Sequence, residues 1–210
     1  MTTMSNPNPV PATDFANVDV GSPQLPGYAT PNGGGWDLVA GGADIWETAD
    51  QFHFVFQELR GDFDVAVRVE SFTPAHLYSK TGLMMRENLD TSSAHVMFFV
   101  FSDNEPRNNN LGAYEMQFRP HAGDNCEAIY PAVRPPAPPE FPAAFPNSWL
   151  RVARRGDQFS AYVSTDGQTW KLYGEKVLTL AETLKVGPAL TSHNTESLAT
   201  ASFRDYKQST

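Results

Sequence analysis

The strongest constraint on the fold is a series of short segments in which apolar and polar residues alternate. The clearest covers residues 62–72, where Phe63, Val65, Val67 and Val69 share one face and charged residues lie between them. A period of two is typical of a β-strand with one buried face and one solvated face. Similar segments recur about every ten residues with turn residues between them, and no long helical pattern interrupts them. The chain is therefore predicted to be all-β, as a sandwich or a barrel.

The expected strands differ in how much of each is buried. The run 94–101 is almost entirely apolar, which is typical of a central strand buried on both faces. A hairpin is expected at residues 162–170, because Asp166-Gly167 favours positive φ at the centre of a tight turn. In chain order, the expected strands are 36–40, 51–59, 62–72, 81–86, 94–101, 114–119, 149–155, 158–164, 186–192 and 199–206.

The length of 210 residues fits a single domain of this class. Residues 1–14 are rich in Asn and Pro and are expected to form a flexible tail, which leaves residues 15–207 for the sandwich. Residues 131–146 contain runs of proline. Because proline cannot donate to a sheet ladder, this segment is predicted to be a surface loop.

The charge of the chain excludes several classes of partner. A net charge of -9 repels nucleic acid and anionic membrane surfaces, and no apolar run is long enough for membrane insertion. The N-terminal segment has neither the basic start nor the apolar stretch of a signal peptide, so a cytoplasmic location is the default expectation. The single cysteine, Cys126, excludes an internal disulfide and lies in no motif for a nucleophile.

Seven segments along the chain carry a resemblance to a known family: GGADIW (41–46), DQFHFVFQ (50–57), GDF (61–63), KTGLMMRE (80–87), WLRV (149–152), STDGQTW (164–170) and VGPALTSHN (186–194). Together they resemble a bacterial domain family of unknown function, named after the yeast regulation-of-enolase protein. The resemblance implies a concanavalin A-like, two-sheet antiparallel jelly-roll sandwich, the fold of legume lectins and glucanases. It also implies an occurrence in secreted or cell-surface proteins, whereas the N-terminal segment of this sequence does not resemble a signal peptide. The family has no agreed activity, so the fold does not supply a function.

A ligand site on such a sandwich would combine an aromatic platform with planar polar side chains. The aromatic ring covers the apolar face of a sugar, and amides, carboxylates or Arg fix the hydroxyl groups. In the structural alternative, Trp46 anchors a loop to the core and Arg86 forms an ion pair with Glu87. The candidate binding residues are Trp46, His53, Tyr78, Arg86, Glu87, Tyr114, Gln117, His193 and Asn194.

Two kinds of metal site are open from the residue types. His53, His95 and His193 would bind zinc or another transition metal if their strands were adjacent; otherwise each is a structural histidine. Calcium needs several oxygen ligands, which residues 103–110 and the pair Asp124-Asn125 offer. A solvated polar loop explains the same residues, and no other cofactor is predicted.

No catalytic constellation is visible. Retaining glucanases place two carboxylates about 5–5.5 Å apart, and the nearest match here is Asp62 with Asp64, followed by Glu70 further along the strand. The solvated face of a strand explains all three. Serine hydrolase and phosphate-binding motifs are absent from the sequence. We therefore expect no enzyme activity.

These observations favour a non-catalytic β-sandwich that recognises carbohydrate or another extended ligand. The alternative is a structural or accessory subunit of a larger assembly. In that case residues 1–14 and 131–146 would contact a protein partner or another copy of the chain. A polysaccharide hydrolase or lyase is the third reading.

Overall fold

The computed structural model describes residues 8–103, 113–131 and 139–209. Apart from a short 3-10 turn at Ala12–Asp14, the regular elements of this part of the chain are strands. Their bounds are β1 Asn8–Pro9, β2 Ala16–Val20, β3 Tyr28–Asn32, β4 Gly35–Gly42, β5 Ile45–Trp46, β6 Ala49–Asp50, β7 Phe52–Arg60, β8 Phe63–Thr73, β9 Lys80–Arg86, β10 His95–Val100, β11 Tyr114–Arg119, β12 Glu127–Ile129, β13 Ser148–Arg155, β14 Gln158–Ser164, β15 Lys171–Val177, β16 Thr183–Thr191 and β17 Asn194–Ser209.

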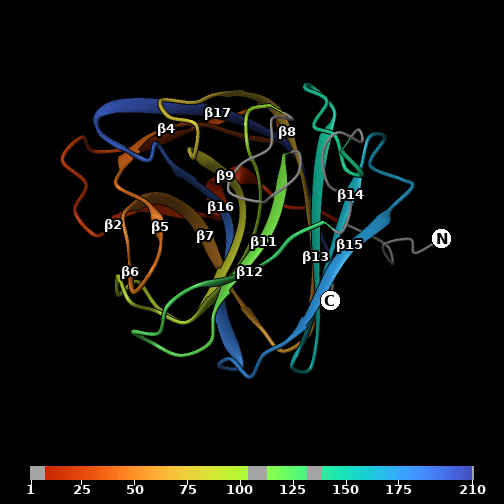
Figure 1. Cartoon of the computed structure of the whole chain (residues 1–210). Helices are drawn as coiled ribbons and strands as arrows, with labels where there is room; N and C mark the ends of the chain where they lie inside the picture. Colours follow the sequence, from red (N-terminus) through yellow and green to blue (C-terminus); the bar gives the residue numbers. More distant parts are fainter. Residues whose placement is uncertain (1–7, 104–112, 132–138, 210) are drawn as a thin grey trace.

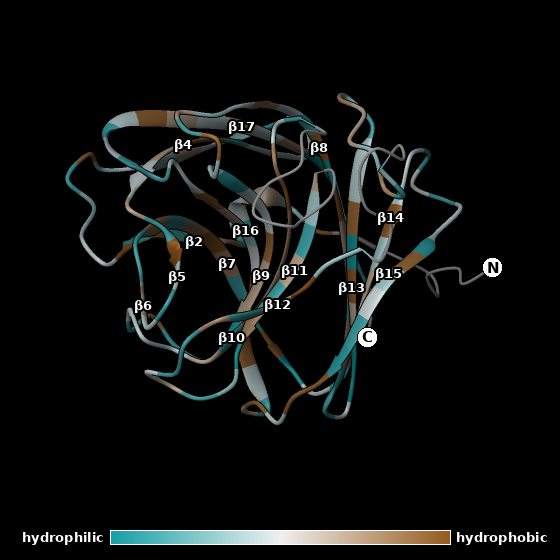
Figure 2. Cartoon of the chain, viewed as in Figure 1, coloured by the Kyte–Doolittle hydropathy of each residue, from teal (hydrophilic) through white to brown (hydrophobic). Residues whose placement is uncertain are grey.

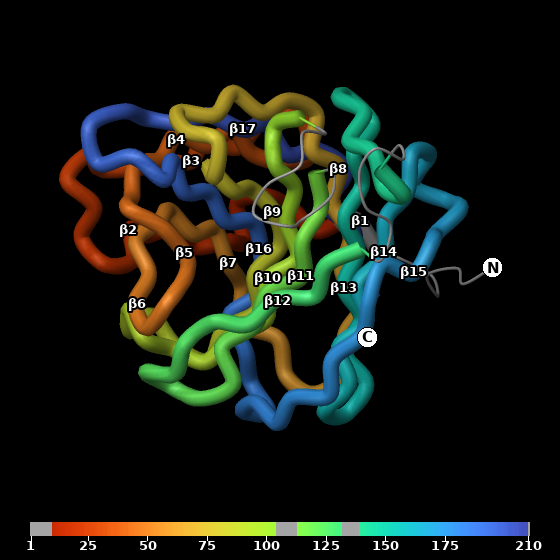
Figure 3. The backbone as a smooth tube through the Cα atoms, viewed as in Figure 1, coloured from red at the N-terminus to blue at the C-terminus, as the bar shows by residue number. Residues whose placement is uncertain are grey.

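The strands form two large antiparallel sheets that face each other (Figure 1). The β8 sheet has the order β15-β14-β13-β8-β17-β4-β3, with β1 pairing with β17. The β9 sheet has the order β12-β11-β10-β9-β16-β7-β2, and Figure 3 traces β9, β10, β11 and β12 side by side. The predicted two-sheet antiparallel jelly-roll sandwich is confirmed.

The main core lies between the two sheets and follows the predicted alternation. In β8, Val65, Val67 and Val69 are fully buried in it, and on the facing sheet Leu83 and Phe98 meet them. The same alternation appears along β13 as brown and teal bands in Figure 2. Burial of these apolar side chains is the main stabilising contribution to the sandwich.

The other face of β8 departs from the prediction of a solvated surface. Asp64 is only 2% exposed, and both of its carboxylate oxygens accept hydrogen bonds from Arg151, at 2.8 and 2.6 Å. The Arg151 guanidinium lies over the rings of Tyr162 and Trp170. The prediction that Asp64 faces water was wrong, because aromatic side chains of neighbouring strands cover this part of the sheet.

The central strands of the β9 sheet, β9, β10 and β11, are buried on both faces, as the apolar run at 94–101 predicts. Its second face carries a separate apolar cluster that includes Phe52, Phe54, Met97 and Phe99. The short hairpin of β5 and β6 covers this cluster, and Ile45 of the hairpin belongs to it. In Figure 1 the hairpin lies on the side of the β9 sheet that is remote from β13, β14 and β15.

Part of the expected N-terminal tail packs against the sandwich. β1 pairs with the end of β17, and the indole nitrogen of Trp36 donates to the carbonyl of Ala12 at 3.2 Å. From the expected proline-rich loop, Phe141 is buried in the main core. Residues 1–7 and 132–138 lie outside the described part of the chain.

A search of the described residues for a helix long and apolar enough to cross a bilayer found none.

Candidate functional site

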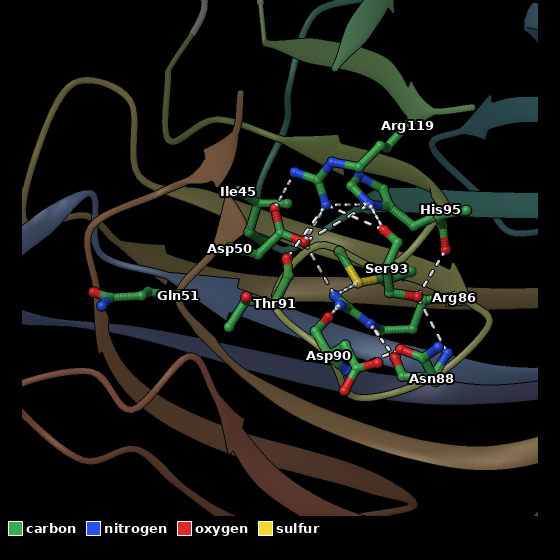
Figure 4. A network of polar contacts seen from close by, with 12 residues as sticks. Ile45, Asp50, Gln51, Arg86, Asn88, Asp90, Thr91, Ser93, His95 and Arg119 are labelled. Carbon is green, nitrogen blue, oxygen red and sulfur yellow. Dashed lines mark hydrogen bonds and ion pairs between the residues drawn. The ribbon is translucent and has the colours of Figure 1, made fainter. Parts of the chain in front are cut away.

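The β5–β6 hairpin is fixed to the sheet beneath it by a buried ionic network (Figure 4). Asp50 accepts a bidentate pair of hydrogen bonds from Arg119, at 2.6 and 2.8 Å, and a third from Arg86 at 3.3 Å. These three side chains are completely buried. The guanidinium of Arg119 also donates to the carbonyl oxygens of Trp46 and Glu47, both at 3.1 Å. The network therefore holds the hairpin turn in one position.

His95 and Cys126 complete the buried floor below the hairpin. Burial lowers the pKa of His95 to about 3 and raises the pKa of Cys126 to about 12. The sulfur lies 3.9 Å from Nε2 of His95, which resembles a nucleophile and its base. Because both groups are neutral at physiological pH, however, the pair lacks the thiolate and imidazolium that such chemistry needs.

A second group of polar side chains, the Lys80 cluster, lies at the open end of the hairpin. The Lys80 ammonium contacts Asp44 Oδ1 at 2.9 Å, the Ile45 carbonyl at 2.8 Å and Gln117 Oε1 at 3.3 Å. It also lies 5.1 Å from the centroid of the Trp46 ring. The Lys80 cluster consists of Asp44, Trp46, Tyr78, Lys80, Gln117 and His193.

The cluster reaches the surface through aromatic and imidazole rings. Nε2 of His193 lies 3.2 Å from Asp44 Oδ2, and the His193 ring stacks on His76 at a centroid distance of 4.6 Å. Tyr78 lies beside both imidazoles, with centroid distances of 5.8 Å to His76 and 5.6 Å to His193. Trp46, Tyr78 and His193 are half-buried, whereas His76 is exposed. Together these rings make a mixed aromatic and polar surface.

The Asp44 carboxylate is ionised at neutral pH. Its burial favours the neutral acid, but the hydrogen bond from His193 and the charge of Lys80 outweigh burial, so its pKa is lowered. The side chain of Asp44 keeps 25% of its surface exposed, whereas that of Lys80 keeps 5%. The charged acceptor therefore faces solvent while its counter-ion lies beneath it.

Four of the predicted binding residues meet in the Lys80 cluster: Trp46, Tyr78, Gln117 and His193. Gln117 is fully buried and donates to the Ile45 carbonyl at 3.0 Å, so it supports the cluster from below. Asn194 follows His193 in the chain, but its side-chain oxygen accepts from the backbone of Glu196.

The other predicted binding residues lie elsewhere. Arg86 is buried and pairs with Asp50, so the alternative of an ion pair with Glu87 was wrong; Glu87 accepts from the backbone N–H of Ala181 instead. Tyr114 belongs to the main core. His53 is buried and contacts Asp19 at 2.8 Å.

The three histidines considered for a metal do not converge. His53 shares a strand face with Val55 of the main core, whereas His95 shares one with Met97 of the second cluster. These two faces of the β9 sheet are opposite. Across residues 8–103, 113–131 and 139–209 there is no group of three or more His, Cys, Asp or Glu side chains that could hold a metal ion. Most of the polar segment 103–110 proposed for calcium lies outside these residues.

The three carboxylates considered for catalysis are each engaged in structural contacts. Asp64 pairs with Arg151, Asp62 accepts from the backbone N–H of Gly156 at 2.7 Å, and Glu70 contacts Arg204 at 3.1 Å.

Sequence reasoning missed Asp44, Lys80 and His76. Lys80 had a detectable signal, because it begins the strand KTGLMMR, in which the other residues are apolar, small or buried. A lysine at such a position needs acceptors nearby. Asp44 lies within the segment that carried the family resemblance, but no spacing rule connects it to Lys80. His76 comes from an irregular loop.

Comparisons with known proteins identify the fold. No protein-family model matches the chain, and no curated protein matches it. Among solved structures, a functionally unknown protein from Saccharomyces cerevisiae superposes with a TM-score of 0.70 at 16% identity, covering 95% of this chain and 98% of that one.

Two proteins of known class show the same architecture. A carbohydrate-binding module from Bacillus subtilis matches with a TM-score of 0.57 at 14% identity over 100% of both chains. The metal-free lectin I-B4 from Griffonia simplicifolia matches with a TM-score of 0.54 at 7% identity, covering 94% of this chain and 93% of the lectin. The chain therefore has the concanavalin A-like jelly-roll fold that these proteins share.

Proposed function

We propose that this protein is a non-catalytic carbohydrate-binding β-sandwich and that the Lys80 cluster is its binding site. The observation that carries the proposal is that half-buried Trp46 and Tyr78 lie against Lys80 and His193, the two residues that contact the ionised carboxylate of Asp44. Flat aromatic rings cover the apolar faces of sugars, and a carboxylate accepts hydrogen bonds from their hydroxyl groups. The buried Lys80 fixes the carboxylate before any ligand arrives, which lowers the entropic cost of binding.

The fold is compatible with this proposal. Structures described as a carbohydrate-binding module and as a lectin share the whole architecture. Because these structures share little sequence identity with the chain, the similarity supports the fold alone. The proposal therefore depends on the side chains of this chain.

A catalytic role has less support in the described residues. The Cys126 thiol and the His95 imidazole are both neutral and buried. The carboxylates Asp62, Asp64 and Glu70 are engaged in structural contacts. In contrast, the groups of the Lys80 cluster suit recognition without bond cleavage.

The backbone at His193 offers a way to test the proposal. This residue has a φ of 52°, in the left-handed region that disfavours residues with a Cβ. Glycine adopts this conformation without strain. Replacing His193 with glycine would therefore remove the side chain and relieve the backbone at the same time.

This strain permits a discriminating experiment. We expect His193→Gly to preserve or raise the free energy of unfolding, because glycine suits the backbone, and to weaken glycan binding at least about tenfold, because the Asp44 contact is lost. Asp205→Gly is the matched control, since Asp205 has a φ of 56° and an exposed side chain on β17, in the opposite sheet. Glycan arrays would supply a ligand, and calorimetry would measure each variant. Unchanged affinity in His193→Gly, or no glycan bound by the wild type, would contradict the proposal.

The second candidate function is that of a subunit in an assembly. The edge strand β15 favours it, because Leu172 is 45% and Val177 is 70% exposed. Exposed apolar side chains on an unpaired edge are typical of surfaces that pair with another chain. Light scattering of the purified protein tests this candidate, and a monomer at micromolar concentration would argue against self-assembly.

A further inference from the structure

We propose that the Lys80 cluster selects uncharged sugars and rejects acidic ones. This inference rests on the carbohydrate-binding function proposed above and adds the chemical class of the ligand. It follows from how the charges and hydrogen-bond donors of the cluster are already used within the protein.

The positive charge of Lys80 is not available to a ligand. An ammonium group has three protons, and Lys80 directs them to three acceptors: Asp44 Oδ1, the Ile45 carbonyl and Gln117 Oε1. The group is also buried. A carboxylate or sulfate on a sugar would therefore find no free proton on Lys80.

The negative charge, in contrast, faces solvent. Oδ1 of Asp44 accepts from Lys80 and from the backbone N–H of Ile45 at 2.7 Å. Within the described part of the chain, Oδ2 contacts His193 alone. A carboxylate oxygen has two acceptor positions, so Oδ2 keeps one for a ligand. An approaching anion would meet this carboxylate first, and like charges in close contact oppose binding.

The two imidazoles present both hydrogen-bonding roles. Nε2 of His193 faces Asp44, and an imidazole that donates there from Nε2 presents Nδ1 as an acceptor when the ring is neutral. Nδ1 of His76 accepts from the backbone N–H of Tyr78 at 3.2 Å, which leaves its Nε2–H as a donor. Hydroxyl groups both donate and accept, so a polyhydroxylated neutral ring matches this alternation of roles. The net charge of -9 acts in the same direction by repelling anionic ligands at long range.

The test compares two ligands that differ by one group. A neutral oligosaccharide from the array and its uronate counterpart, in which a carboxylate replaces the hydroxymethyl group, are titrated into the full-length protein by calorimetry. We expect the uronate to bind at least about tenfold more weakly at low ionic strength, with the gap narrowing as salt screens the repulsion. This salt dependence is measured on the wild type, so it needs no variant to fold.

Asp44→Asn then tests the origin of the selectivity. It removes the charge while retaining the shape of the side chain, and we expect the affinity gap between the two ligands to shrink to about threefold or less. Asp205→Asn is the matched control, because it changes the net charge equally at a surface position with a φ of 56°, which Asn tolerates. The gap should be unchanged in this variant.

The outcomes separate the two proposals. Equal affinity of the wild type for the neutral and acidic ligands would overturn the selectivity and leave carbohydrate binding standing. A gap that persists in Asp44→Asn would also overturn it. Binding of neither ligand would overturn both the selectivity and the proposed function.

Discussion

The buried His95 should make the stability of this protein fall on mild acidification. Burial lowers the pKa of this imidazole from the ordinary value of 6.5 to about 3. The unfolded chain therefore takes up a proton near pH 6.5, whereas the folded protein does not until near pH 3. The stabilisation is fully present above pH 6.5 and is lost as the pH falls below that value, since the unfolded state binds more protons throughout this window.

The size of the effect in the range pH 5–7 depends mainly on the ordinary pKa of the unfolded chain. At pH 5.5 about nine tenths of the unfolded imidazoles carry a proton and almost none of the folded ones do, which gives a slope of about 1.2 kcal/mol per pH unit. Between pH 7 and pH 5 the contribution of His95 sums to about 2 kcal/mol. That is a large part of the 5–15 kcal/mol that stabilises a typical domain.

The assay is urea unfolding followed by tryptophan fluorescence at pH 7 and pH 5, with the wild type and His95→Gln. Glutamine keeps a polar side chain in the network but does not titrate. The variant is expected to be less stable at pH 7, yet its loss of free energy between the two pH values should be about 2 kcal/mol smaller than that of the wild type. The same loss in both proteins would refute the reasoning, because His95 would then take up its proton equally in the folded and unfolded states.

Two further predictions concern the same buried region. Asp50→Asn leaves the guanidinium groups of Arg86 and Arg119 without their counter-ion, so it should lower the free energy of unfolding by about 3–5 kcal/mol in urea titrations. Glu182→Gln breaks only the exposed pair with Arg60 and should leave the free energy of unfolding nearly unchanged. An equal loss in the two variants would count against the burial argument. Cys126, whose pKa burial raises to about 12, should resist a chromogenic thiol reagent in the native protein and react fully in denaturant, so rapid reaction of the native thiol would show that the floor below the hairpin is open to solvent.

Much of the fold could be predicted because its strands are long and regular. The alternation at residues 62–72 and the apolar run at 94–101 correspond to β8 and β10, and their buried positions follow the predicted period. Asp64 shows the limit of this reasoning. A period of two tells which residues share a face, but aromatic side chains on β14 and after it decide whether that face meets water.

The candidate site was harder to predict, for reasons of topology. Trp46, Tyr78, Gln117 and His193 were identified by residue type, but their meeting depends on strand pairings far apart in sequence. Arg86 looked like a ligand-binding residue because nothing in the sequence reveals the hairpin that buries it; β5 and β6 have only two residues each. Lys80 was missed because a lysine is ordinarily assumed to face solvent.

The anchoring of the β5–β6 hairpin determines where ligand preference could change without loss of the fold. Ile45 and Asp50 anchor the base of the hairpin, because Ile45 lies in an apolar cluster and Asp50 pairs with two guanidinium groups. Glu47 and Thr48, at the tip of the same hairpin, are exposed. Substitutions at the tip can therefore alter the rim beside Trp46 while the base of the hairpin remains intact. Within the six residues from Ile45 to Asp50, positions that tolerate variation thus lie between positions that do not. Libraries aimed at new sugar specificity should vary Glu47 and Thr48 and keep Ile45 and Asp50.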